Sequence, residues 1–319
     1  MSDDADGLEA PRGPLHPIGV VAKRTGITLH VLRAWERRYA VVEPVRTSGG
    51  QRLYTDAHIE RLRLLRRVTE AGRNISQVAA LSDAELAGLA AADEQAPVEG
   101  PSPEGASNAA SYRSASLAAG ERLDGDAVYG ALMRALVSLR PGEFLGEVLL
   151  PLLRDVGERW NAGRLGPAQE HVVSVAVRRV LTWLLDAYEP APDAPVLVLT
   201  TVSGEQHEFG AMVVGAVALE EGWRVVYLGA SLPPEEIARA ATMLNAPVVG
   251  VSMVNRNVTD AVAGVEALRR LMPASVRVLA GGAGAHVRAE SLRAAGAEVL
   301  TELQDVRASL RAHRLAVAS

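Results

Sequence analysis

The sequence predicts a multidomain α and α/β protein: a winged helix-turn-helix, a helical bundle and a doubly wound parallel sheet. Residues 14–85 alternate short helical patterns with turns and a glycine-turned hairpin. Residues 123–190 repeat apolar positions at helical spacing. Residues 195–316 alternate apolar strand patterns with amphipathic helices, which is typical of a parallel sheet covered on both faces. Residues 86–122 are rich in Ala, Ser, Gly, Pro and acidic residues, and this composition predicts a flexible linker.

The composition narrows the possible function classes. The chain has 319 residues, 48% of them hydrophobic, and no apolar run approaches the roughly 18 residues of a membrane span. Cysteine is absent, which excludes disulfides, thiolate metal sites and a cysteine nucleophile. The first residues, "MSDDADGLEAPRGP", are acidic and polar, unlike a secretory or transit peptide. We therefore expect a cytoplasmic protein with no membrane partner.

Charge is distributed unevenly along the chain. The formal net charge is −5, yet residues 11–80 hold 13 Arg and Lys against 5 Asp and Glu. The remainder of the chain is correspondingly acidic. A basic module joined to an acidic body predicts a nucleic-acid reader attached to a second functional part.

The basic segment reads as a winged helix-turn-helix. "IGVVAKRTG" predicts a first helix that ends at Gly26, and "TLHVLRAWERRY" predicts a second helix with Thr28 as its N-cap. "EPVRTSGGQRLYT" predicts two short strands around a Gly49-Gly50 turn, which would form the wing. Arginines on such a scaffold can bind phosphates while a helix reads bases in the major groove. The alternative is a basic helical pair that is merely solvated.

This segment closely resembles the MerR family of transcriptional regulators over roughly residues 16–85. The resemblance is carried by W-E-R-R-Y and by a following G-x-R-x-Y, and it implies binding to a double-stranded DNA operator. It places the phosphate and base contacts on Arg33, Arg37, Arg38, Arg52 and Tyr54. Trp35 is expected in the core. Many relatives dimerise through a long coiled coil after the wing, but no sustained heptad is visible here, so we expect self-association through another part of the chain.

Residues 123–190 predict a small helical bundle. Its three helices are "VYGALMRALVSL", "PGEFLGEVLLPLLRDVGERW", which Pro141 opens, and "PAQEHVVSVAVRRVLTWLLDAY". A short fourth helix is compatible with the pattern.

The parallel sheet predicts a ligand site, because ligands of such sheets lie at the carboxyl ends of the strands. Glu205, His207 and Gly210 follow the first strand in the order E-x-H-x-x-G. Ser252 follows the third strand, and Gly281 and Gly282 follow the fourth. A carboxylate can accept a ring N–H and so fix the tautomer of a metal-bound histidine. The alternative is a structural or simply exposed histidine.

These three elements resemble the cobalamin-binding domain of methionine synthase and the methylmalonyl mutases, whose signature is D-x-H-x-x-G, S-x-L and G-G. Glu205 replaces the aspartate and Val254 replaces the leucine of S-x-L. The resemblance implies that His207 is the lower axial ligand of cobalt. The nucleotide tail of the cofactor would then pass Ser252 and the Gly281–Gly282 pair.

The helical segment adds a W-x9-E-H pattern formed by Trp160, Glu170 and His171. It resembles the cap of the cobalamin-dependent MerR-type light sensors of the CarH and LitR group. The resemblance implies that residues 123–190 cap the upper face of adenosylcobalamin, with Trp160 against the adenosyl group and the Glu-His pair lining its pocket. The alternative is that Trp160 fills the bundle core, which is where we expect Trp183.

The resulting hypothesis is an adenosylcobalamin-dependent, light-sensing transcriptional regulator with no catalytic role. A homo-oligomer, expected to be a tetramer, would form with the ligand, bind the operator in the dark as a repressor, and dissociate on illumination. Two alternatives remain. One is a corrinoid methyltransferase or mutase module, and the other is a cobalamin-independent MerR repressor controlled by a protein partner.

Overall fold

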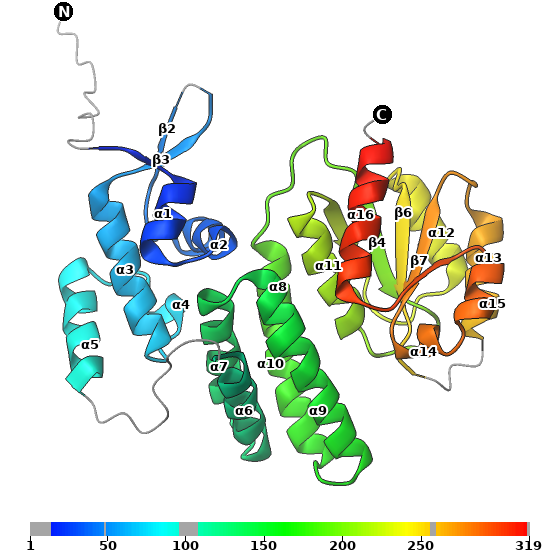
Figure 1. Ribbon diagram of the computed structural model, residues 1–319, viewed down its shortest axis with the longest axis horizontal. Coiled ribbons are helices and arrows are strands. Elements are labelled where there is room, and N and C mark those ends of the chain that lie inside the picture. Colours follow the sequence, from blue (N-terminus) through cyan, green and yellow to red (C-terminus); the bar gives the residue numbers. More distant parts are fainter. Residues whose placement is uncertain (1–13, 48, 96–107, 256–259, 318–319) are drawn as a thin grey trace, which may run out of the picture. The chain divides into compact units, whose positions relative to one another are not determined.

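The computed structural model describes residues 14–47, 49–95, 108–255 and 260–317. The chain forms two compact units, Met1–Ala176 and Val177–Ser319. The first contains the winged module and most of the helical bundle, and the second contains the parallel sheet (Figure 1). Within the described residues, no helix combines the length and the apolar character needed to cross a membrane.

The N-terminal module is a winged helix-turn-helix, as predicted. Its elements are β1 (His16–Pro17), α1 (Ile18–Thr25), α2 (Leu29–Tyr39), β2 (Val45–Arg46), β3 (Arg52–Tyr54), α3 (Asp56–Glu70), α4 (Ile75–Val78) and α5 (Asp83–Gln95). The three strands form an antiparallel sheet in the order β1-β3-β2. Gly26 ends α1 in the left-handed conformation, with a φ of 69°, and Trp35 is fully buried. Both of these predictions are confirmed.

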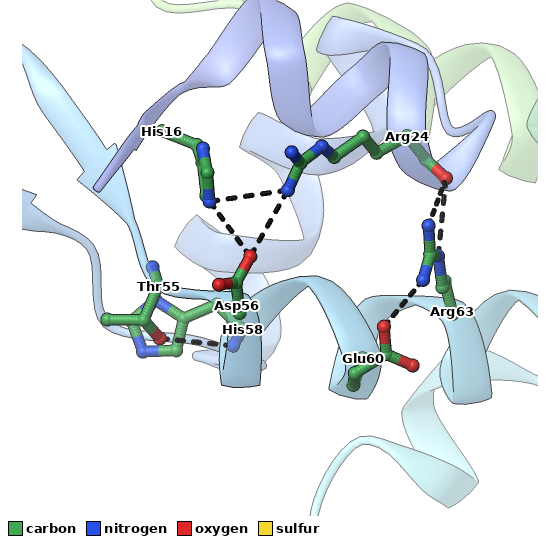
Figure 2. A network of polar contacts seen from close by, with 7 residues as sticks. All are labelled: His16, Arg24, Thr55, Asp56, His58, Glu60 and Arg63. Carbon is green, nitrogen blue, oxygen red and sulfur yellow. Dashed lines mark hydrogen bonds and ion pairs between the residues drawn. The ribbon is translucent and has the colours of Figure 1, made fainter. Parts of the chain in front are cut away.

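Polar contacts at the helix starts fix the module, although not always as predicted. Thr28 precedes α2, but its side chain makes no capping hydrogen bond. Thr55 does cap α3, because its Oγ1 accepts from the backbone N–H of His58 at 3.2 Å (Figure 2). Beside it, the Asp56 carboxylate lies 2.8 Å from Nε2 of His16 and 3.1 Å from the guanidinium of Arg24 (Figure 2). This network joins β1, α1 and α3.

The predicted flexible linker over 86–122 is largely wrong. Helix α5 continues to Gln95, and helix α6 (Asn108–Glu121) occupies most of the second half. The remaining residues, 96–107, lie outside the described parts of the chain. Alanine is the best helix former, so an Ala-rich and Ser-rich stretch becomes helical once it has a surface to pack on. For α6 that surface is α7 (Gly125–Ser138).

The helical bundle contains the three predicted helices, and α6 is the fourth. After α7, the second predicted helix begins as α8 (Pro141–Glu143), widens into the π-helical segment η1 (Phe144–Leu149), and continues as α9 (Leu150–Asn161). The third is α10 (Pro167–Asp186). The N–H of Leu150 donates to the carbonyl of Leu145, five residues earlier. Such wide turns can accommodate Pro151, which has no N–H and would crowd the carbonyl four residues before it.

The second unit is a five-stranded parallel sheet in the order β5-β4-β6-β7-β8. Its strands are β4 (Val196–Thr201), β5 (Arg224–Tyr227), β6 (Val248–Ser252), β7 (Arg277–Gly281) and β8 (Glu298–Leu300). Its helices are α11 (Phe209–Glu220), α12 (Pro234–Met243), α13 (Ala261–Leu271), α14 (Ala283–His286), α15 (Ala289–Ala294) and α16 (Leu303–Val317). Figure 1 shows α11 and α16 on one face and α12, α13 and α15 on the other. The chain order reverses between β4 and β6, so the crevice for a ligand is expected at their carboxyl ends.

Candidate functional site

The predicted Glu205–His207 pair exists, and it lies where the strand order reverses. Glu205 is completely buried. Its Oε1 accepts from the backbone N–H of His207 at 2.9 Å and lies 2.5 Å from the ring Nδ1 of His207. Its Oε2 accepts from the backbone N–H groups of Val254 and Asn255 at 2.7 and 2.6 Å. One carboxylate therefore orients the histidine and joins the loop after β4 to the loop after β6.

The electrostatics of this pair determine which ring nitrogen is available. Burial raises the pKa of Glu205, but the hydrogen bonds from Asn255, His207 and Val254 outweigh it and hold that pKa below its ordinary value. An ionised carboxylate can only accept, so Nδ1 of His207 carries the proton that is donated to it. The lone pair of the neutral ring is then on Nε2, and the His207 side chain is 62% exposed. This is the state in which an imidazole binds a metal.

Two residues that we did not predict hold the loop in place. Thr201, at the end of β4, donates from Oγ1 to the carbonyl of Glu205 at 2.5 Å and accepts from the backbone N–H of Ser231 at 2.7 Å. The Ser231 side chain accepts from the N–H of Gly204 at 3.0 Å. Paired threonines at the end of an apolar strand are the only sequence signal for this anchor, since Ser231 is 30 residues further along the chain.

The predicted glycines are required to different degrees. A Cβ on Gly210 would lie 2.8 Å from Oγ of the buried Ser252, so this glycine lets α11 approach the end of β6. A Cβ on Gly282, whose φ is 98°, would lie 2.4 Å from the carbonyl oxygen of Met253. At Gly281 the nearest atom would be at an ordinary 3.4 Å. Gly282 is thus needed for close packing against backbone and Gly210 for close packing against the Ser252 side chain, whereas Gly281 is needed for neither.

Alanine at these two neighbouring positions should have different effects. Gly282→Ala is expected to lower the free energy of unfolding by about 3 kcal/mol, because it adds left-handed strain to a steric overlap with rigid backbone. Gly281→Ala should change it by less than about 1 kcal/mol, since its Cβ has room. Urea denaturation of both variants measures the difference. Equal stabilities would show that the chain after β7 can move to accept a side chain.

The helical residues of the predicted upper pocket lie on the surface of the bundle. The Trp160 side chain is 51% exposed at the end of α9, so it does not fill the core, whereas Trp183 is 3% exposed and does. Near the start of α10, Oε2 of Glu170 lies 2.7 Å from Nδ1 of His171, and Ser174 donates to Oε1 of Glu170. The structure thus presents a large aromatic side chain and a fixed carboxylate to solvent, and large exposed apolar groups often indicate a binding surface.

The residues predicted to contact DNA fall into two groups. Three arginines of α2 are exposed, as the prediction requires: Arg33, Arg37 and Arg38. Tyr54 is fully buried and its hydroxyl donates to Glu36, so the prediction that Tyr54 contacts phosphate is wrong. Arg52 is half-buried, and its Nε lies 3.3 Å from the other oxygen of Glu36. Glu36 thus joins the wing to α2, and burial raises its pKa despite the nearby Tyr54 and Arg52.

Several arginines of the basic segment are used inside the module. Arg61 donates to the carbonyls of Val41 and Ala79 at 2.7 and 2.8 Å. Arg66 donates to the carbonyl of Thr25 at 2.8 Å and to Glu70 at 2.7 Å. The positive charge that faces a ligand is therefore smaller than the count over residues 11–80 indicates.

The two groups should behave differently on mutation. Arg37→Ala is expected to weaken operator binding about 10-fold, to reduce its salt dependence by about one phosphate contact, and to leave stability unchanged. Tyr54→Phe should instead lower the free energy of unfolding by about 2 kcal/mol, because it removes a hydrogen bond to a buried carboxylate. Fluorescence anisotropy over a salt series and thermal unfolding measure the two effects. A Tyr54→Phe variant of full stability that lost the same salt slope would restore Tyr54 as a phosphate contact.

The comparisons with known proteins cover all three predicted parts. Residues 17–85 match the MerR HTH family of regulatory proteins. Residues 195–310 match the B12 binding domain, and residues 116–185 match a second B12 binding domain family. The second match begins within α6, in agreement with the place of that helix in the bundle. The Methanosarcina barkeri monomethylamine corrinoid protein covers 63% of this chain and 96% of its own with a TM-score of 0.52, and at 17% identity it supports the fold alone.

Two curated relatives extend over most of the chain. The HTH-type transcriptional repressor CarH of Myxococcus xanthus is 38% identical over 269 residues, which is 84% of this chain and 89% of CarH. The repressor CarA of the same organism is 32% identical over 285 residues, which is 88% of this chain and 91% of CarA. This similarity makes the chain a regulator and not an enzyme, so the alternative of a methyltransferase module is rejected. The chain belongs to the CarH and CarA family of MerR-type transcriptional regulators with B12-binding domains.

Proposed function

We propose that this protein is an adenosylcobalamin-dependent, light-sensing transcriptional repressor. The observation that carries the proposal is the His207 ring, whose Nδ1 is held by the buried Glu205 and whose side chain is 62% exposed at the switch point of the sheet. This donor suits cobalt, because a single imidazole of fixed tautomer can occupy one axial position. Gly210 has no side chain to place against the Ser252 hydroxyl, so α11 and the end of β6 lie close together at this edge of the sheet.

The proposed roles of the other residues follow from their chemistry. Trp160 offers an apolar surface to the adenine ring, and the carboxylate of Glu170 can accept from ribose hydroxyls. Glu170 is held by His171 and Ser174, so its orientation does not have to be selected on binding. Bound adenosylcobalamin would supply a cobalt–carbon bond that visible light cleaves. Loss of the adenosyl group would leave the Trp160 surface without its partner.

DNA binding would depend on the state of assembly. One winged module does not offer all of its arginines to DNA, since Arg61 and Arg66 are used internally. Several modules in one homo-oligomer would bind neighbouring operator half-sites with a high effective concentration. We propose a tetramer that forms with adenosylcobalamin in the dark and dissociates on illumination, so that the operator is released in light.

One experiment tests the cofactor, the assembly and the light response together. The purified chain is incubated with adenosylcobalamin, and its absorbance spectrum and size-exclusion profile are recorded in the dark and after green light. The expected result is a coloured oligomer with histidine-bound cobalt in the dark and a smaller species after illumination. A colourless protein would overturn the proposal in favour of a regulator controlled by a protein partner. A coloured oligomer that light leaves unchanged would retain the cofactor and remove the light response.

A further inference from the structure

The loop between α6 and α7 holds a leucine in an unfavourable conformation. Leu123 has a φ of 62°, in the left-handed region that is unfavourable for a residue with a Cβ. Its N–H donates to the carbonyl of Gly120 at 3.0 Å, and the N–H of Asp124 donates to the carbonyl of Ala119 at 3.0 Å. These bonds form a helix C-terminal motif in which the left-handed position is usually glycine. The fold itself therefore favours glycine at position 123.

The side chain of Leu123 does not offset this cost within the described residues, because it is 52% exposed. An apolar side chain that remains half exposed gains less from folding than a buried one, while its backbone is strained. Backbone strain of this kind is often associated with binding or catalysis.

The loop lies at the end of the bundle that presents the proposed pocket residues. Arg159, next to Trp160, pairs with the Glu121 carboxylate at 2.6 Å. Gln169, next to Glu170, donates to the carbonyl of Glu121 at 2.7 Å. Both of these neighbours thus bind Glu121, the last residue of α6, two positions before Leu123.

Close packing of the loop on the first turns of α10 supports this placement. A Cβ on Gly120 would come within 2.4 Å of Val173, and one on Gly125 would lie 3.5 Å from Val172. The glycines on both sides of Leu123 therefore lie directly against α10, just after His171. Val175, one helical turn beyond His171, is also 58% exposed. Leu123 belongs to the same partly apolar end of the bundle as Trp160.

We propose that Leu123 is a further wall of the pocket for the adenosyl group and that it favours cobalamins with a large upper ligand. This rests on the function proposed above. A leucine side chain beside an aromatic surface can pack on the edge or face of a purine, whereas a water molecule on cobalt would leave it exposed. Leu123 would then discriminate between upper ligands without touching cobalt.

The test is Leu123→Gly, because glycine relieves the backbone and removes only the side chain. We expect adenosylcobalamin affinity in the dark to fall about 10-fold, the scale set by burying part of a leucine. Affinity for hydroxocobalamin, whose upper ligand is small, should remain within about twofold of the wild-type value, and the apo protein should unfold at the same or a higher temperature. Leu123→Asn, which also tolerates the left-handed region, should behave alike.

Asn245→Gly is the matched control. Asn245 also has a positive φ, 49°, and follows α12 in the second unit. It should preserve stability and both affinities. Unchanged adenosylcobalamin affinity in Leu123→Gly would overturn the proposal, and so would equal losses for the two cobalamins, since those would indicate a change in folding rather than a lost contact. A wild-type protein that binds neither cobalamin would instead overturn the proposed function itself.

Discussion

His207→Ala is expected to weaken cobalamin binding by at least the roughly 100-fold that marks the loss of strong support at a metal site. The cobalamin that remains bound should show a spectrum without a histidine ligand. The physical reason is that Nε2 of His207 is the donor that the buried Glu205 prepares, and alanine offers no replacement. Absorbance titration in the dark measures both the affinity and the spectrum.

The control removes a comparable pair elsewhere in the same unit. Nε2 of His313 lies 2.9 Å from the Glu298 carboxylate between α16 and β8. His313→Ala should leave the affinity and the spectrum unchanged. If His207→Ala kept the wild-type spectrum, His207 would not be the axial ligand.

Glu205→Gln should reduce both stability and cofactor affinity. The amide is close in shape to the carboxylate, but it carries no charge and turns one acceptor into a donor that faces other donors. We expect a loss of about 3 kcal/mol in the free energy of unfolding, because two backbone N–H groups, of Val254 and Asn255, lose a charged partner. Cobalamin affinity should fall about 10-fold to 100-fold, since His207 loses its orienting acceptor.

The pH dependence of stability distinguishes this role from simple packing. The folded state depresses the pKa of Glu205. The ionised carboxylate therefore contributes fully to the free energy of unfolding above its ordinary pKa of 4.5, and this contribution is lost as the pH falls through the lower pKa of the folded state. The difference in the free energy of unfolding between the wild type and Glu205→Gln should therefore shrink on acidification below about pH 4.5. Glu290→Gln, at an exposed residue of α15, should follow the wild-type curve. Parallel curves for wild type and Glu205→Gln would show that the charge of Glu205 is not what stabilises the loops.

The sequence predicted the order of the folds, because periodicity and turn residues act locally. The wing, the strands of the parallel sheet and the helices of the winged module and the bundle lie close to their predicted positions. The linker prediction for residues 86–122 was wrong because composition does not show whether an Ala-rich stretch has another helix to pack on. In the structure α6 packs on α7. The second half of the Glu205 network could not be predicted either, since it depends on backbone N–H groups 49 and 50 residues away.

Two aromatic residues show why a sequence motif does not by itself predict whether a side chain is exposed. Tyr54 belongs to the G-x-R-x-Y pattern, but only the structure shows that its hydroxyl is directed at Glu36 rather than at solvent. Trp160 lies four residues after the buried Val156, a spacing that by itself favours the core. It is nevertheless 51% exposed, because it extends the apolar stripe of α9 past Val156, the last buried residue of that helix.

The π-helical segment determines the direction in which that stripe points. Phe144, Val148, Leu152 and Val156 are all buried and, with Trp160, recur at every fourth position. In a regular α-helix, residues four positions apart are offset by about 40° around the helix axis, so over this length they would no longer lie on one face. The wider turns of η1 hold more residues each and rotate the stripe back. The orientation of Trp160 is thus set by residues 144–149, more than ten positions upstream, and replacing the wide turns of η1 by regular α-helical turns without a deletion would turn its side chain by about 100°.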